Sequence, residues 1–322
     1  PRGFTFSLLT SNFEHFEQLM EQALIRVPSL ADAGVKELIN GPEAFTPDGS
    51  FILGESPRLK GFYVGAGFNA YGIAAAGGAG RALSEWIVAG EPTMDLWPVD
   101  IRRFHDHHAD GDWVRERTLE LYAKHYTMSW PLEEHDSARP RRTSPLYERL
   151  KEAGACFGEK MGWERPNWYA PKGVEPKDDY SFSMPNWETH VRREHLACRA
   201  SAALFDQTSF AKFEVSGSDA EAALSWICAN DVRGAPGKLT YTQLLNERGG
   251  IECDLTVARL AEDRFYIVTG TGFATHDYQW IESRLPKAMD VQLKDRTNEF
   301  AVLSLMGPKS REILSELTLD DV

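Results

Sequence analysis

A glycine-rich stretch near residue 65 sets the strongest constraint on how this chain folds. It reads Gly-Ala-Gly-Phe-Asn-Ala-Tyr-Gly-Ile over residues 65–73 and is followed by more glycines at residues 77–80. The apolar run at residues 62–64 predicts a strand, residues 65–71 a connecting loop, and residues 72–89 a helix with Gly90 as its C-cap. This arrangement leaves free backbone N–H groups at the positive end of a helix dipole, which favours a flat or anionic ligand.

The glycine stretch does not match the common phosphate-binding patterns. The dinucleotide fingerprint G-x-G-x-x-G fails at its third glycine, where Ala70 stands, and no Walker lysine followed by serine or threonine is present. Two interpretations therefore stay open from the pattern alone. Either the helix start binds a ligand, or Gly72, Gly77 and Gly80 only let the helix pack closely against a sheet.

Composition and charge narrow the classes of function. The 322 residues are enough for two domains, and a net charge of −13 without a basic block argues against nucleic-acid binding. No apolar run approaches the ~20 residues that span a bilayer, so we expect no membrane partner. The four cysteines lack CxxC or CxxH spacing, which predicts no metal site, no disulfide framework and a reducing compartment such as the cytoplasm.

Both ends of the chain have the pattern of a protein interior. The first residues, which lack an initiator Met, resemble the inside of a strand. Residues 300–314 predict a strand, a Gly-Pro turn and a helix shortly before the last residue. We therefore expect a fragment that is truncated at both ends and inactive by itself.

An amphipathic helix is predicted near the N-terminus. Ser11 and Glu14 form a capping-box pattern, apolar residues then repeat at helical spacing as far as Val27, and Pro28 predicts the stop. We expect this helix to pack in a core, with His15 as a solvated surface residue.

Residues 91–144 carry a histidine patch and a basic run. His105, His107 and His108 lie among aspartates, and without a further well-placed ligand a solvated loop is favoured over a metal site. The basic run over residues 139–142 contains a proline and predicts a linker.

Short strands and tight turns dominate the part of the chain after Ser144. Strands are predicted at residues 213–215, 241–245, 256–260 and 264–268, a helix at 218–227 and a hairpin turn at 246–250. Asp254 follows that turn between apolar strand residues, so we expect it to be half-buried. From the pattern alone, a turn-capping carboxylate is favoured over a functional one.

Several long stretches of the chain resemble a known family. Residues 61–88 (GFYVGAGFNAYGIAAAGGAGRALSEWIV), 90–104 (GEPTMDLWPVDIRRF) and 40–57 (NGPEAFTPDGSFILGESP) resemble the C-terminal end of the FAD-binding amine oxidoreductase domain of sarcosine and dimethylglycine dehydrogenases. In that family the helix N-terminus faces the pyrimidine end of the flavin, so the resemblance implies FAD as a cofactor. The FAD-binding residues that it implies are Gly65, Gly67, Phe68, Asn69, Tyr71, Gly72 and Ile73.

Residues 145–322 resemble the folate-binding aminomethyltransferase domain of the glycine cleavage system, which the same dehydrogenases carry behind the flavin domain. The family's functional aspartate after a Gly-Gly turn corresponds to Asp254, and Cys253 replaces the acidic residue that usually precedes it. The resemblance implies tetrahydrofolate as a second cofactor, with Asp254 as the catalytic residue that orients the folate N10 and moves its proton. Tyr241, Thr256 and Val268 are the further folate-binding residues that it implies.

The resemblance also implies the organisation and the reaction. The fold class is mixed α/β and α+β, with the end of a flavin domain at residues 1–94, a bridging region at 95–144 and a truncated folate-binding domain at 145–322. The implied reaction oxidatively demethylates sarcosine or dimethylglycine, and tetrahydrofolate captures the one-carbon unit as 5,10-methylenetetrahydrofolate. Electron-transfer flavoprotein or oxygen would accept the electrons, in the bacterial cytoplasm or the mitochondrial matrix.

Two alternative functions stay open at this point. One is a non-catalytic relative that resembles the regulatory subunit of pyruvate dehydrogenase phosphatase, and the other is a folate-dependent aminomethyltransferase without flavin chemistry. The flavin-type residues 1–94 argue against the second alternative.

Overall fold

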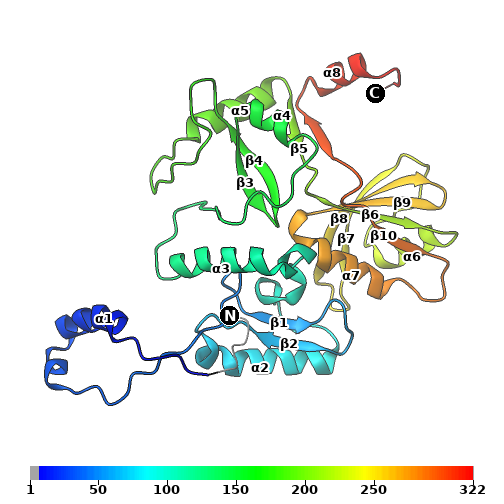
Figure 1. Cartoon of the computed structure of the whole chain (residues 1–322). Coiled ribbons are helices and arrows are strands. Elements are labelled where there is room, and N and C mark those ends of the chain that lie inside the picture. Colours follow the sequence, from blue (N-terminus) through cyan, green and yellow to red (C-terminus); the bar gives the residue numbers. More distant parts are fainter. Residues whose placement is uncertain (1–6, 322) are drawn as a thin grey trace.

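The computed structural model describes residues 7–321 (Figure 1). Its first elements are helix α1 (Phe13–Arg26) and the 3-10 turn η1 (Pro28–Asp32). Asn12 caps α1 by accepting a hydrogen bond from the backbone N–H of His15, so the cap lies one residue after the predicted Ser11. His15 itself is exposed, as predicted.

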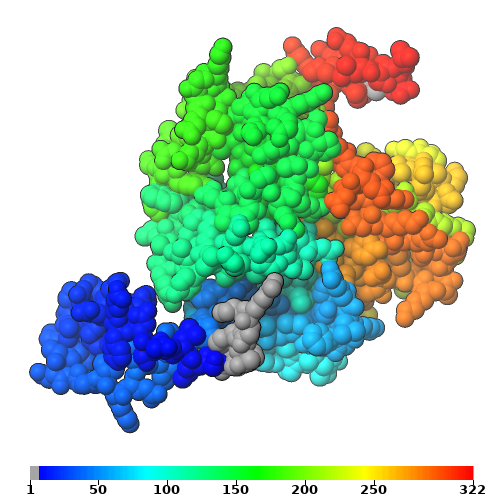
Figure 2. All heavy atoms as spheres, viewed as in Figure 1, coloured from blue at the N-terminus to red at the C-terminus, as the bar shows by residue number. Residues whose placement is uncertain are grey.

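The prediction that this helix packs in a core is wrong. No residue of the fully described helix α1 is buried, and the helix stands off the body of the molecule (Figures 1 and 2). Amphipathic spacing specifies that a helix has an apolar face, but it does not specify what covers that face.

The glycine-rich stretch forms a β-hairpin followed by a helix. Strands β1 (Ile52–Glu55) and β2 (Tyr63–Ala66) pair antiparallel, and helix α2 (Gly72–Ala89) ends at Gly90, whose φ is 79°. The helix and its C-cap are confirmed. The strand continues two residues further than predicted, through residues 65 and 66, so that the connecting loop is shortened to residues 67–71.

Residues 95–144 form a bridging region of short turns and one longer helix. Its elements are η2 (Trp97–Val99), η3 (Ile101–Arg103), η4 (Asp106–Ala109) and α3 (Gly111–Lys124). The chain continues through a small unit made of α4 (Tyr147–Glu152), β3 (Ala155–Lys160), β4 (Trp163–Tyr169) and α5 (Glu188–Ala200).

The basic run at residues 139–142 is not the free linker that its composition predicts. The Arg139 guanidinium donates to both carboxylate oxygens of Glu164, at 2.9 and 2.6 Å, and the Glu164 side chain is only 4% exposed. The Arg142 guanidinium lies over the Trp163 ring, 4.1 Å from its centroid. A paired guanidinium and carboxylate satisfy each other's hydrogen bonds, so these contacts fasten the bridging region to β4.

An antiparallel five-stranded sheet forms the centre of the last part of the chain. Its spatial order is β10 (Gln292–Asp295), β6 (Ala211–Ser216), β9 (Arg264–Thr269), β8 (Ile251–Ala261) and β7 (Leu239–Leu245). The remaining elements are β5 (Ala203–Asp206) paired with β11 (Leu303–Met306), the helices α6 (Ala220–Ile227), α7 (Ala274–Arg284) and α8 (Ser310–Leu317), and the turn η5 (Thr271–Phe273).

Helices α6 and α7 cover one face of this sheet. They leave the other face uncovered, although Phe300 packs against Tyr266 of β9 there. The core contains Leu224 of α6, Ile281 of α7 and alternate residues of the strands, such as Val257 and Phe265. Because side chains alternate along a strand, Asp254 and Thr256 of β8 point to the uncovered face. Within residues 7–321, no helix combines the length and apolar character needed to cross a bilayer.

Candidate functional site

The four residues expected to bind folate meet on the uncovered face of the sheet. In the strand register, Tyr241 of β7 lies opposite Thr256 of β8, and Thr256 lies opposite Val268 of β9, so the three form a row across the sheet. Asp254 lies two residues before Thr256 on the same strand and therefore on the same face. The strand pairing thus assembles all four positions.

Asp254 is exposed, so the prediction of a half-buried residue is wrong. Cys253 and Leu255 occupy the inward positions of β8 and turn the intervening side chain to solvent. The Asp254 carboxylate accepts a hydrogen bond from the Gln243 side-chain amide at 2.8 Å, and the adjacent carboxylate raises the pKa of Tyr241. Asn246 caps the hairpin turn in place of Asp254: its Oδ1 accepts hydrogen bonds from the backbone N–H groups of residues 248 and 250.

A buried polar group that the sequence analysis missed lies on the covered side, behind Asp254. The Asp277 carboxylate of α7 accepts hydrogen bonds from Thr269 Oγ1 at 2.5 Å and from His276 Nδ1 at 2.8 Å, and Asp277 is 1% exposed. Burial lowers the pKa of His276, but its bonds to Asp277 and Glu252 outweigh burial, and the net shift is upward.

A sequence signal for this group was present. Asp277 precedes the buried Ile281 by four residues and therefore lies on the apolar stripe of α7, where an acidic residue needs a partner. Cys253, His276 and Asp277 also bring a thiol, an imidazole and a carboxylate within 4.8 Å of one another, which the cysteine spacing did not indicate.

The predicted flavin-binding residues lie at the end of β2, in the loop and at the start of α2. Gly65 belongs to β2, and the Phe68 ring stacks on Phe51 with 5.1 Å between centroids. Ile73, in the first turn of α2, is fully exposed, and Tyr71 is largely exposed. Among residues 7–321, no side chain caps α2, so its first backbone N–H groups are free to meet an anionic edge.

Asn69 differs from the other residues of this loop, because its side chain is turned inward. It is 1% exposed, its Oδ1 accepts from the Thr46 backbone N–H at 2.9 Å, and its Nδ2 donates to the Gly67 carbonyl at 2.6 Å. The Asn69 backbone has a φ of 50°, a left-handed conformation that asparagine tolerates better than most residues. The side chain therefore fixes the shape of the loop.

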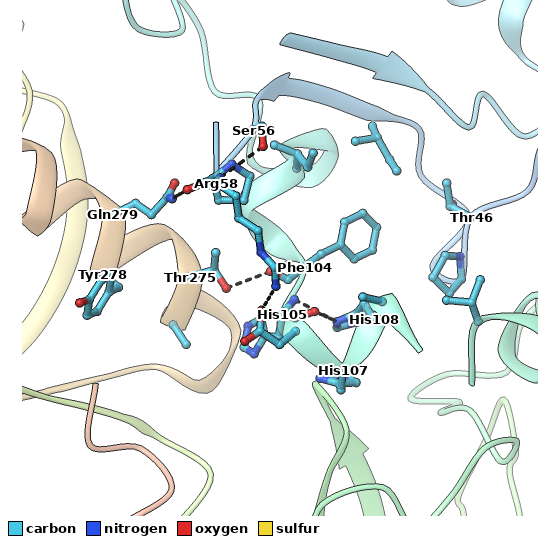
Figure 3. Close-up of a pocket in the computed structure, with 18 of the residues that line it drawn as sticks. Thr46, Ser56, Arg58, Phe104, His105, His107, His108, Thr275, Tyr278 and Gln279 are labelled. Carbon is cyan, nitrogen blue, oxygen red and sulfur yellow. Dashed lines mark hydrogen bonds and ion pairs between the residues drawn. The ribbon is translucent and has the colours of Figure 1, made fainter. Parts of the chain in front are cut away.

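A cavity of about 1250 Å³ lies where the three parts of the chain meet (Figure 3). Its walls come from the β1–β2 region, the turns η3 and η4, and the outer face of α7. Arg58 reaches across it to Asp106, and Thr275 Oγ1 of α7 donates to the Phe104 carbonyl oxygen at 2.9 Å. Of the residues predicted to bind FAD or folate, only Gly67 lines this cavity.

The histidine patch lines this cavity, so the prediction of a solvated loop is wrong. The three side chains are half-buried, and the rings of His107 and His108 lie 3.9 Å apart, against Trp113. Burial and neighbouring positive charges lower the pKa of both His107 and His108 to about 3, and the pKa of His105 is also lowered. The rings are therefore neutral near pH 7 and pack as aromatic groups.

Three family models match successive parts of the chain. "FAD dependent oxidoreductase" matches residues 3–86, "FAD dependent oxidoreductase central domain" matches residues 89–144, and "GCVT N-terminal domain" matches residues 146–322. The mixed helix-and-sheet fold agrees with the expected fold class.

Curated relatives match almost the whole chain. Human (Homo sapiens) mitochondrial sarcosine dehydrogenase is 38% identical over 98% of this chain and 38% of its own length. The 4-methylaminobutanoate oxidase (formaldehyde-forming) of Paenarthrobacter nicotinovorans is 40% identical over 98% of this chain and 38% of its own length. The mitochondrial pyruvate dehydrogenase phosphatase regulatory subunit of Mus musculus is 36% identical over 96% of this chain and 36% of its own length.

This chain thus spans less than two-fifths of the length of each of these relatives. The order of the three matched models and the extent of these similarities show that the chain belongs to the sarcosine and dimethylglycine dehydrogenase family, in which FAD-dependent oxidoreductase domains precede a glycine-cleavage T-protein-like aminomethyltransferase domain.

Proposed function

We propose that this chain is the central part of an FAD-dependent oxidoreductase that removes an N-methyl group from a small amino acid, either sarcosine or dimethylglycine. The oxidoreductase models over residues 3–144 support the flavin chemistry. The names of two relatives, a sarcosine dehydrogenase and a 4-methylaminobutanoate oxidase, support an N-methylated amino acid as the substrate. Electron-transfer flavoprotein or oxygen is the proposed electron acceptor.

The start of α2 fits an isoalloxazine ring. Its uncapped N–H groups offer positive charge, and Tyr71 and Ile73 at the start of the helix are exposed. Gly65, Gly67, Phe68, Tyr71, Gly72 and Ile73 would hold the ring, and Asn69 would act by fixing the loop. Bound FAD supplies the hydride acceptor for oxidation of the N-methyl group.

We also propose that tetrahydrofolate binds on the uncovered face of the β7–β8–β9 sheet. The observation that carries this proposal is the gathering of Asp254, Tyr241, Thr256 and Val268 on that face. When bound, tetrahydrofolate supplies the nitrogen nucleophiles that take up the one-carbon unit. Asp254 would orient N10 and exchange its proton, Tyr241 would offer its ring and hydroxyl, and Thr256 and Val268 would support the pterin.

The bridging region at 95–144 would hold the two sites in one molecule, with residues 1–94 and 145–322 as the flavin-type and folate-type parts. We propose a bacterial cytoplasmic or mitochondrial matrix location, the latter in keeping with relatives whose names specify mitochondria.

A spectroscopic experiment tests the oxidoreductase role. The full-length protein that contains this chain is purified and mixed anaerobically with sarcosine or dimethylglycine. Bleaching of the flavin absorbance band is followed, and methylenetetrahydrofolate is assayed in parallel. Bleaching with either amine and formation of the folate product are the expected results. A regulatory role, which the similarity to the phosphatase subunit favours, predicts no amine-dependent bleaching.

A further inference from the structure

The start of helix α7 lies directly beneath the strands that carry the proposed folate face. The Asp277 carboxylate bonds to Thr269 of β9, and Thr269 lies opposite Leu255 of β8 in the strand register. Leu255 is the neighbour of Asp254 in sequence. Asp277 therefore fixes β9 to the helix, and the pairing of β9 with β8 brings this attachment to the level of Asp254, from the opposite side of the sheet.

His276 connects Asp277 to the hairpin turn through Glu252. Its Nδ1 bonds to Asp277, and its Nε2 lies 3.6 Å from a carboxylate oxygen of Glu252. The other carboxylate oxygen of Glu252 accepts a hydrogen bond from the Asn246 side chain at 2.8 Å, and Asn246 organises the turn that precedes Asp254. His276 and Asp277 together thus hold the hairpin turn and the strand.

Residue Trp97 of the bridging region packs on this group. Its ring stacks on Phe273 with 4.8 Å between centroids and meets the His276 ring edge-on at 5.3 Å. His276 is 5% exposed, so the aromatic cover is nearly complete. Through Trp97, the bridging region thereby contacts the residues that support the folate face.

The chemistry of this group favours a geometric role over a purely stabilising one. Apolar side chains in a buried space stabilise a protein at least as well as an ion pair does. The role of buried ionic groups that has the best support is to specify one arrangement of the elements around them. The charged and titratable groups that face His276 are Asp277 of α7, Glu252 of β8, and Arg102 of η3, with the Cys253 thiol beside Asp277. They come from three separate elements, so their pairing holds those elements in one mutual position.

We propose that His276 and Asp277 are positioning residues for Asp254, and that they set the placement of its carboxylate against the folate nitrogen through Thr269 and Glu252. This inference rests on the proposed folate role of Asp254. It assigns no proton transfer to His276 or Asp277, which lie on the covered side of the sheet.

Two substitutions of Thr269 test the inference with little change of volume. Thr269→Val removes the hydroxyl that bonds to Asp277, and Thr269→Ser keeps it; Asp277→Asn is a second, more severe variant. Thr271→Val is the matched control, because that buried hydroxyl bonds to Ser209 at 2.9 Å and not to Asp277. Each variant is made in the full-length protein that contains this chain; flavin reduction is measured by stopped flow, and kcat and KM for tetrahydrofolate are measured by product formation.

We expect Thr269→Val and Asp277→Asn to lower kcat/KM for tetrahydrofolate by roughly tenfold or more, because a displacement of about 1 Å has large effects on reaction geometry. Flavin reduction should keep the parental rate, Thr269→Ser should restore folate kinetics, and Thr271→Val should resemble the parent. A purely structural role predicts that both activities fall together and that Thr269→Ser gives no selective rescue.

The outcomes separate this inference from the proposed function. Parental folate kinetics in Thr269→Val, in a protein whose Asp254→Ala variant loses folate product, overturn the inference alone. Equal loss of both activities in Thr269→Val and Thr271→Val also overturns it. If Asp254→Ala itself makes folate product at the parental rate, the proposed folate role fails, and the positioning role fails with it.

Discussion

The side chain of Asn69 bonds to the backbone on both sides of the flavin-type loop: its Oδ1 accepts from the N–H of Thr46, and its Nδ2 donates to the carbonyl of Gly67. These bonds tie residues 67–71 to the segment that precedes β1. The shape of the loop therefore depends on one buried amide that must donate and accept at the same time.

Asn69→Asp tests this dependence. The carboxylate loses the donor to Gly67 and places negative charge against a carbonyl oxygen, which should cost about 1–3 kcal/mol in the free energy of unfolding. In the flavin-bound protein we expect weaker FAD binding or a lower midpoint potential. Denaturant unfolding and potentiometry measure the two effects, with the exposed Asn186→Asp as the control. An unfolding free energy and a midpoint potential both equal to the parent's would contradict the prediction.

Two glycine substitutions should act in opposite directions. Gly67 has a φ of 63°, and a Cβ there would lie 2.5 Å from a Thr46 methyl group, so Gly67→Ala should destabilise the protein. Gly77 lies inside α2 with open space around it, so Gly77→Ala should add about 0.5–1 kcal/mol of stability. Thermal unfolding measures both changes. The idea of a strained, close-packed turn is refuted if Gly67→Ala melts at or above the parental temperature.

Asp254→Ala should separate the two proposed activities. Loss of the carboxylate removes a proton-transfer group of a kind worth typically 10²–10⁴ in rate, while flavin reduction proceeds elsewhere in the protein. In the full-length protein we expect near-parental stopped-flow flavin reduction, a sharp fall in methylenetetrahydrofolate and release of free formaldehyde. Asp263→Ala, in the exposed turn after β8, is the control. A parental rate of folate product formation would show that Asp254 has no catalytic role.

The cavity histidines should make the protein sensitive to acid. The pKa of His107 and His108 is about 3 in the folded protein, and free histidine titrates near 6.5. Between these values the unfolded state binds more protons, so stability falls as the pH drops from about 6.5 towards 3. The slope of the unfolding free energy against pH is proportional to the number of extra protons that the unfolded state binds. His107→Gln should lower that number by up to about one. An unchanged slope between about pH 6 and 4 would contradict this prediction.

Local patterns predicted the elements around the glycine stretch and along the antiparallel strands. Helix α2 and its cap at Gly90 are confirmed, because the alanines, the helical spacing and the final glycine all favour the same structure. The resemblance to a family correctly indicated the family, and the strand register placed the four folate-type residues on one face. Whether those residues bind folate, and whether the loop binds FAD, stays a prediction.

Local patterns failed where distant segments decide the environment. The composition around His105 is polar, but α7 and the turn between β3 and β4 lie beside the patch, which is half-buried. The basic run at 139–142 has the composition of a linker, but the partner of Arg139 lies 25 residues away in β4. Two residues of the same type, Asp254 and Asp277, also lie in opposite environments: Asp254 is exposed and Asp277 is buried. Strand alternation and helix packing decide their environments, and residue type does not.

Helix α7 belongs to two packed regions at once. Its inner face completes the core of the sheet with Ile281, and its outer face holds the Phe104 carbonyl through Thr275 and Glu91 through Arg284, at 3.1 Å. When the sheet loses its order, this helix releases the segments on its outer side as well. Calorimetry should therefore show one cooperative unfolding transition that includes both the oxidoreductase-type part and the aminomethyltransferase-type part of the chain. The family models, by contrast, assign these two parts to separate domains.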